Sequence, residues 1–102
     1  MANLKPESRL VKLIREHLRE KWGATSHKVH GSVFAEAGSS DLYGTLPGGT
    51  ALYLEVKVPG KKATPAQLAW LDAERRRGAI AGVVTSVAEV DELIERGDWT
   101  EL

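Results

Sequence analysis

Apolar residues recur at helical spacing in three parts of the chain, over residues 7–22, 64–77 and 86–96. In the first part a single apolar stripe repeats every fourth residue, at Leu10, Ile14, Leu18 and Trp22. The second and third parts each open with a hydroxyl residue that is followed three positions later by Gln or Glu, the pattern of a capping box. A glycine follows each part and suits a helix end. The pattern therefore predicts three helices.

Residues 51–58 alternate in character, as the residues of a β-strand do. The apolar face is Leu52, Leu54, Val56 and Val58, and the other face is Ala51, Tyr53, Glu55 and Lys57. Residues 42–46 form a shorter strand candidate, and Pro47-Gly48-Gly49 between the two segments is typical of a hairpin turn. Residues 24–30 and the apolar run 80–85 are the other strand candidates.

The predicted elements follow one another as helix, strand, hairpin, helix, strand and helix. This order indicates an α/β fold with an αβββαβ core and an additional C-terminal helix. A right-handed crossover through residues 64–77 makes the last strand parallel to residues 51–58. We therefore expect a mixed central sheet flanked by helices, in a single domain that spans residues 1–102.

The hairpin turn determines whether two acidic residues meet. A three-residue loop at positions 47–49 places Leu46 opposite Thr50, and the same register places Asp41 opposite Glu55. Directly opposed residues share a face of the sheet and lie about 5 Å apart. Two carboxylates at that distance repel each other unless a cation lies between them. A loop of even length would instead direct Asp41 to the opposite face.

The ordered set of motifs resembles the PD-(D/E)XK nuclease superfamily, in which an Asp opens a hairpin and the returning strand carries Glu-x-Lys. More narrowly, residues 6–95 resemble a stand-alone VRR-NUC domain. The matching motifs are Glu7-Ser8, Lys28-Val29-His30-Gly31, Gly38-x-x-Asp41-Leu42, Leu54-Glu55-Val56-Lys57-x-Pro59-Gly60 and Thr64-Pro65-x-Gln67. Ser40 stands where the superfamily has Pro, a departure that removes no metal ligand.

The resemblance implies a fold of the restriction-endonuclease type and a metal-dependent endonuclease that hydrolyses phosphodiester bonds in DNA. It implies structured or branched DNA, such as Holliday junctions or flaps, as substrate, Mg²⁺ or Mn²⁺ as cofactor, and a homodimer. The implied metal ligands are Asp41, Glu55, the backbone carbonyl of Val56, and Glu7. Lys57 and Gln67 complete the implied catalytic group, and the DNA-binding candidates are Lys28, His30, Lys61 and Lys62.

Each of these residues also has a structural interpretation. Glu7 suits the dipole at the start of a helix, and Glu16 and Glu20 are rival acidic donors within a predicted salt-bridged outer face. The capping box accounts for Gln67 without catalysis. Glu55 and Lys57 would be a surface ion pair if no metal bound. A module that binds DNA without cutting it therefore remains the alternative function.

Composition narrows the other possibilities. The chain has 14 basic and 14 acidic residues, but residues 57–78 carry a net charge of +4 and residues 79–102 one of −5, an asymmetry that favours approach of a polyanion from one side. Without cysteine there is neither a disulfide nor a thiolate ligand. The residues around Gly60-Lys61 do not fit a phosphate-binding loop, so no nucleotide cofactor is expected. No apolar run reaches the roughly 20 residues of a membrane span, and a cytoplasmic location is expected.

Overall fold

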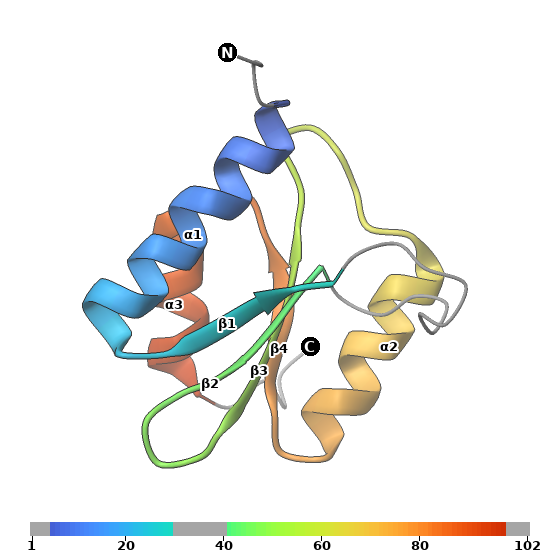
Figure 1. The fold of residues 1–102 in the computed structure, drawn as a ribbon. Helices are drawn as coiled ribbons and strands as arrows, with labels where there is room; N and C mark the ends of the chain where they lie inside the picture. Colours follow the sequence, from blue (N-terminus) through green and yellow to red (C-terminus); the bar gives the residue numbers. More distant parts are fainter. Residues whose placement is uncertain (1–4, 30–40, 98–102) are drawn as a thin grey trace.

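The computed structural model describes residues 5–29 and 41–97. Within them the chain forms three helices and a four-stranded sheet in the order expected from the sequence, which confirms the predicted α/β fold class (Figure 1). In chain order the elements are α1 (Pro6–Trp22), β1 (Thr25–Lys28), β2 (Leu42–Thr45), β3 (Ala51–Val56), α2 (Pro65–Arg76), β4 (Ile80–Val84) and α3 (Val87–Arg96).

The strands are arranged in the sheet in the order β1-β2-β3-β4. The first three strands pair antiparallel, and β4 is parallel to β3. Helix α2 makes the crossover between these two parallel strands. The sheet is therefore mixed, as predicted. A parallel pair such as β3–β4 requires a long connection, which α2 provides, whereas the antiparallel β2–β3 pair needs only a tight turn.

The helices cover the two faces of the sheet, with α1 and α3 on one face and α2 on the other (Figure 1). The main core lies between the sheet and the α1/α3 layer. Its apolar side chains from the helices are Val11, Ile14, Leu18, Val90, Leu93 and Ile94, and those from the strands include Leu42, Leu52, Leu54 and Val56. Tyr53 and Glu55 alternate with these strand residues and therefore lie on the α2 face, where Tyr53 meets Trp70 edge to face.

Two glycines are needed for the path of the chain towards the sheet. Gly23 ends α1 in the left-handed conformation, with φ of 65°, and its N–H bonds to the carbonyl of Arg19. Gly44 lies where β1 crosses closely over β2, and a Cβ at this position would overlap the carbonyl oxygen of Thr25. The close β1–β2 contact therefore depends on the missing side chain at position 44.

Several local expectations were wrong. The strand predicted for residues 51–58 ends at Val56. Leu68, although it is an apolar residue of the helix predicted for residues 64–77, is 50% exposed. Ser86 caps α3 by accepting from the N–H of Glu89, but the Glu89 carboxylate bonds to the N–H and hydroxyl of Thr85 rather than completing a capping box. In the part of the chain that the structure describes, no helix is long and apolar enough to cross a membrane.

Candidate metal centre

The β2–β3 hairpin has the register expected from its three-residue turn. The N–H of Leu46 donates to the carbonyl of Thr50 at 2.9 Å, and Leu42 pairs with Leu54. Asp41 immediately precedes Leu42, so the same register places it opposite Glu55. Its Oδ2 accepts a hydrogen bond of 3.0 Å from the backbone N–H of Val56. The acidic residue at the start of the hairpin therefore lies at the end of β3, beside Glu55.

Glu55 is the central residue of the site and is 1% exposed. Its Oε2 accepts a hydrogen bond of 2.9 Å from the Gln67 amide nitrogen and lies 3.3 Å from the Lys57 Nζ. Its Oε1 is buried and has no hydrogen-bond partner among the described residues. A buried carboxylate oxygen without a donor is costly. The polar side of β3 is thus an interior face under α2, not the solvent-facing surface that a simple ion pair would need.

The electrostatic surroundings of Glu55 favour a neutralised carboxyl group. Burial, followed by the negative charge of Asp41, raises the pKa of Glu55 to about 7. Lys57 opposes this rise through its hydrogen bond and charge. Near neutral pH the pair therefore has a strong tendency to take up a positive charge, either as a proton or as a cation.

Gln67 has two roles that sequence reasoning treated as alternatives. Its Oε1 accepts from the N–H of Thr64 at 2.8 Å, and its own N–H bonds to the Thr64 hydroxyl, which completes the capping box of α2. Its Nε2 donates to Glu55 at 2.9 Å. The same side chain therefore fixes the start of α2 and orients the buried carboxylate.

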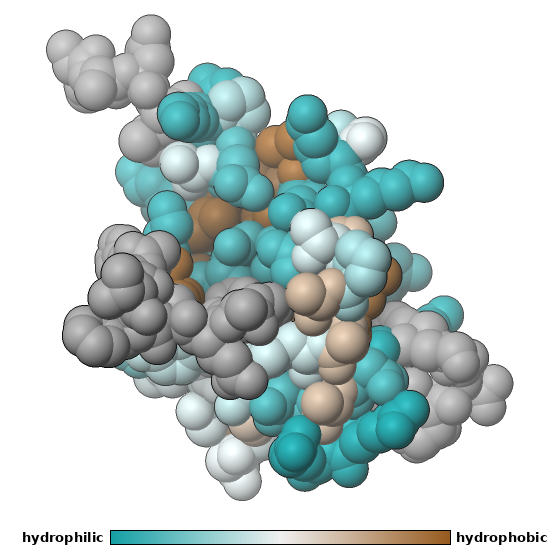
Figure 2. Space-filling view, turned by 90° about the vertical axis from the view of Figure 1, so that its right-hand side faces the viewer, coloured by the Kyte–Doolittle hydropathy of each residue, from teal (hydrophilic) through white to brown (hydrophobic). Residues whose placement is uncertain are grey.

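Lys57 and Glu7 line one cavity of about 440 Å³ beside the N-terminus of α1, together with the exposed Lys61 and Lys62. Seen from the side of α2, a patch of apolar atoms is surrounded by hydrophilic surface above that helix (Figure 2). Glu7 is exposed in the first turn of α1. The structure brings Glu7 towards Lys57 but shows no contact between Glu7 and the Asp41–Glu55 pair.

The donor set suits a hard divalent cation. Within residues 5–29 and 41–97, no group of three His, Cys, Asp or Glu side chains could hold a metal ion, and the carboxylates of Asp41 and Glu55 are a pair. The backbone carbonyl of Val56 is a third candidate ligand oxygen. A strand residue directs its N–H and C=O to the same side, and the N–H of Val56 bonds to Asp41. Carboxylate and carbonyl oxygens are the ligands that Mg²⁺ and Mn²⁺ prefer. The orphaned Glu55 Oε1 fits such an ion.

The remaining predicted residues lie further from the acid pair. Lys28 is exposed at the end of β1, and His30 lies outside the described residues. Glu16 and Glu20, the rival donors, are both exposed on α1. The outer face of α1 is not the salt-bridged surface expected, since Arg15 bonds to Ser26 and the contact of Arg19 with Glu20 is 3.9 Å long.

Sequence reasoning also missed a polar cluster that joins α1 to α3. Asp91 accepts hydrogen bonds from His17 at 2.7 Å, from Lys21 at 2.8 Å and from the indole N–H of Trp22 at 2.8 Å. Burial disfavours the charged form of Asp91, but these three donors outweigh it and lower the pKa of the carboxyl group. The cluster could not be predicted from the sequence of α1, because its acceptor, Asp91, lies about 70 residues away along the chain.

The mixed sheet, the helices on both faces and the buried acid–lysine site define a nuclease-type domain with a restriction-endonuclease-like core. The sequence model of the VRR-NUC domain matches residues 3–88, and the chain belongs to this family. Members of this nuclease family generally use divalent metal ions.

Two solved structures support the assignment. A chain titled VRR_NUC domain is 35% identical and superposes with a TM-score of 0.73, covering 90% of this chain and 97% of its own length. A second, titled VRR_NUC domain protein, is 19% identical with a TM-score of 0.67 over 93% of this chain and 89% of its own, and shows the fold alone. No curated protein matches this chain.

Proposed function

We propose that this chain is a divalent-metal-dependent endonuclease that hydrolyses phosphodiester bonds in DNA. The observation that carries the proposal is the buried Glu55 carboxylate, which faces Asp41 with one oxygen unpaired among the described residues and is held by Lys57 and Gln67 through the other. A surface ion pair without function has no need for burial or for a second carboxylate, and is worth little in stability.

Asp41, Glu55 and the backbone carbonyl of Val56 would hold the metal ion, with Glu7 as a more distant candidate. When bound, Mg²⁺ or Mn²⁺ supplies Lewis acidity at a phosphate oxygen and lowers the pKa of a water that attacks the phosphorus. The chain's own residues do the positioning. Gln67 and Lys57 fix one oxygen of Glu55, which leaves its other, buried oxygen without a partner among the described residues.

Lys57 is the residue that can act on the substrate directly. Its side chain is 18% exposed, so the ammonium group lies at the boundary between the buried carboxylate and the cavity that also contains Glu7. A fixed positive charge there stabilises the additional negative charge that develops on the phosphate during hydrolysis. Lys57 therefore contributes to the chemical step more than to metal binding.

The proposal is tested by cleavage assays with purified variants in Mg²⁺ or Mn²⁺. Asp41→Asn and Glu55→Gln should reduce the cleavage rate by at least 1,000-fold while the thermal unfolding transition remains cooperative. Lys57→Ala should lower the rate at saturating metal but leave the metal concentration for half-maximal activity nearly unchanged. Glu20→Gln, an exposed acid on α1, is the matched control and should cleave normally.

Undiminished cleavage by the Glu55→Gln variant would contradict the proposal. A wild-type chain that binds DNA but cleaves no duplex, flap or junction in either metal would instead be a DNA-binding module that retains the nuclease fold. The two results are separated by measuring binding and cleavage on the same labelled DNA.

We also propose branched DNA, such as Holliday junctions or flaps, as the preferred substrate and a homodimer as the active form. A two-fold symmetric dimer presents two sites to a symmetric junction and can cut both strands. Cleavage of a junction should be at least ten times faster than that of the matching duplex, and light scattering should give twice the 11.1 kDa mass of the chain. Equal rates on both substrates would contradict the branch preference, and a monomer at assay concentrations would contradict the dimer.

A further inference from the structure

A long groove lies between α1 and the free edge of β1, on the side of the sheet opposite α2. Its volume is about 780 Å³. Helix α1 and β1 meet at the turn that follows α1 and diverge from there (Figure 1). Val11 and Ala24, both buried, contribute apolar surface to its floor. The groove is therefore a concave surface that the fold builds, not a chance hollow between loops.

The rim of the groove is strongly basic. Four basic residues line it, Lys12, Arg15, Arg19 and Lys28, against the single acid Glu16 among the described lining residues. Lys12 and Arg19 are seven residues apart on α1, which corresponds to about 10 Å along the helix axis. One strand of a DNA duplex presents about three phosphates over that distance. The spacing of the charges thus matches a run of backbone phosphates.

The basic side chains differ in what they already bind. Arg15 is fixed, since its guanidinium donates to the hydroxyl of Ser26 at 3.2 Å and to the carbonyl of Ser26 at 3.0 Å. Lys12 and Lys28 have no ion-pair partner within residues 5–29 and 41–97, and Arg19 has only the 3.9 Å contact with Glu20. Arg15 therefore fixes the helix against the strand, while the other charges remain available for a ligand.

One end of the groove lies near the start of β2, which Asp41 immediately precedes. Lys28 pairs with Leu42 across the β1–β2 ladder, and the N–H of Val29 donates to the carbonyl of Asp41 at 2.7 Å. The groove and the Glu55 side chain lie on opposite faces of the sheet, so DNA held in the groove would reach the acid pair by passing around the β1 side of the sheet. The backbone contact between Val29 and Asp41 connects the strand that lines the groove to the start of the hairpin.

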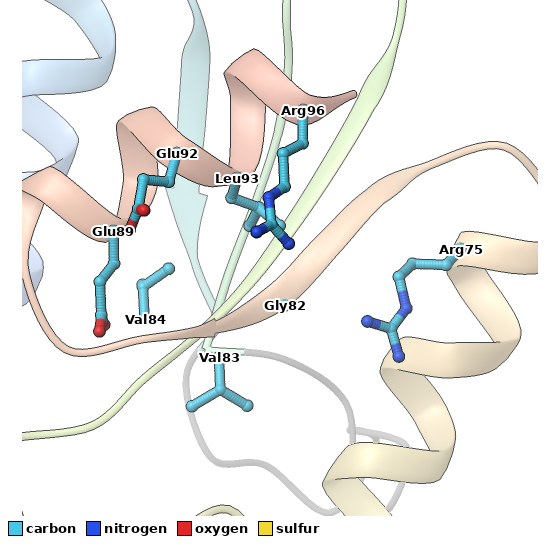
Figure 3. Close-up of a pocket in the computed structure, with 8 residues that line it drawn as sticks. All are labelled: Arg75, Gly82, Val83, Val84, Glu89, Glu92, Leu93 and Arg96. Carbon is cyan, nitrogen blue, oxygen red and sulfur yellow. The ribbon is translucent and has the colours of Figure 1, made fainter. Parts of the chain in front are cut away.

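The opposite edge of the sheet is different. A smaller cavity of about 310 Å³ lies beside β4, where Arg75 of α2 and Arg96 of α3 are balanced by Glu89 and Glu92 (Figure 3). A hollow with both signs of charge offers no net attraction to a polyanion. The formal net charge of zero thus conceals a segregation, and one local excess of positive charge lies in the groove beside β1.

We propose that the groove between α1 and β1 binds the sugar–phosphate backbone of DNA that flanks the cleavage site. The inference rests on the proposed nuclease function for its ligand, but it concerns residues outside the metal centre. Lys12, Arg19 and Lys28 contact phosphates, and Arg15 holds the groove open. Phosphate contacts of this kind fix the orientation of the DNA without reading its sequence.

The test is equilibrium binding of fluorescently labelled duplex and junction DNA, measured by anisotropy in EDTA so that no cleavage occurs. The Lys12→Glu/Arg19→Glu variant should bind at least tenfold more weakly than wild type at 100 mM salt. The slope of log affinity against log salt concentration should fall by about 0.9 for each phosphate that the variant no longer neutralises. Arg9→Glu is the matched control, because Arg9 is exposed on the same helix but does not line the groove.

The milder variant Lys12→Gln/Arg19→Gln checks that the result does not come from misfolding or from added negative charge, and it should retain the wild-type melting temperature. Equal weakening by Arg9→Glu would show general electrostatic attraction and overturn the proposal. So would unchanged affinity in both double variants. If the wild type binds through the groove but never cleaves DNA, the proposed nuclease function fails and the groove proposal stands. If the double variants bind and cleave DNA as the wild type does, the groove proposal fails and the nuclease function stands.

Discussion

At the scale of single residues, Glu55 combines burial, a neighbouring carboxylate and two donors on one oxygen. Because its pKa of about 7 lies above the ordinary value of 4.5, the folded protein takes up a proton here more readily than the unfolded chain. The stability that comes from protonation is present in full below pH 4.5 and is lost as the pH rises through about 7. Folding without metal is therefore penalised above neutral pH.

A first prediction concerns this penalty. In EDTA at pH 8, Glu55→Gln should raise the free energy of unfolding by about 1–3 kcal/mol, because an amide carries no charge and can donate to Asp41. The gain should disappear near pH 4.5, where wild-type Glu55 is protonated as well. Denaturant unfolding at both pH values measures the difference, with Glu16→Gln as control. A variant that is less stable than wild type at pH 8 would contradict the assigned environment.

A second prediction uses the same site with metal. Adding Mn²⁺ at pH 8 should raise the melting temperature of the wild type, because an ion that binds only the folded state stabilises it. Glu55→Gln and Asp41→Asn should show little or no rise. The effect should weaken as the pH is lowered below about 7, since protons compete with the ion for Glu55. An equal rise in both variants would place the ion elsewhere.

Gln67 permits a third prediction that separates its two roles. Gln67→Glu keeps an acceptor for the Thr64 N–H, so α2 should remain capped, but it replaces the donor to Glu55 with a third negative charge. Cleavage should fall at least tenfold, and the melting temperature without metal should fall more at pH 8 than at pH 5. Normal activity in this variant would show that Gln67 acts only as a helix cap.

The sequence alone predicted that Asp41 lies opposite Glu55, because a three-residue turn fixes the register of a hairpin. The register in turn fixes which side chains share a face. The sequence could not predict that Gln67 both caps α2 and bonds to Glu55, because the capping pattern involves only the oxygen of its side-chain amide. The burial of Glu55 was likewise hidden, because the cover comes from α2 rather than from a neighbour along the chain.

At the scale of elements, α1 and α3 are joined by the Asp91 cluster. A fourth prediction is that Asp91→Asn lowers the free energy of unfolding by about 2 kcal/mol at pH 7, since three donors lose a charged acceptor. The lowered pKa of Asp91 means that its contribution is present above the unfolded value of 3.8 and is lost as the pH falls below it. Glu92→Gln, an exposed neighbour, should have little effect on the same denaturation curves.

The strand pair β1–β2 gives a fifth prediction. Gly44→Ala should destabilise the fold by about 3 kcal/mol, because the added methyl group would overlap the Thr25 carbonyl and push β1 away from β2. Thr45→Ala, at an exposed position of the same strand, is the control. Unfolding curves measure both changes. A Gly44→Ala variant that is as stable as the wild type would contradict the close crossing of the two strands.

Element order and type followed from hydrophobic periodicity, and the crossover rule correctly gave the parallel β3–β4 pair. Two side-chain contacts were not expected from the sequence. Glu89 bonds back to Thr85, four residues earlier, and Asp91 accepts hydrogen bonds from α1, and neither contact is visible in the hydrophobic periodicity.

At the scale of the whole molecule, the two edges of the sheet carry different charge. Residues 57–78 and the groove beside β1 are basic, whereas residues 79–102 carry a net charge of −5. DNA should therefore approach from the side of α1, β1 and the cavity that contains Lys57. Charge segregation explains how a neutral chain can bind a polyanion.

The hydrogen bonds from Arg15 to Ser26 have a consequence for self-association. Outward-pointing carbonyls on a terminal strand normally invite a foreign strand to extend the sheet. Here a guanidinium already occupies that carbonyl, so a second copy cannot continue the ladder at β1 without first displacing Arg15. A dimer formed through this side of β1 would lose the hydrogen bond, which disfavours pairing of two copies there.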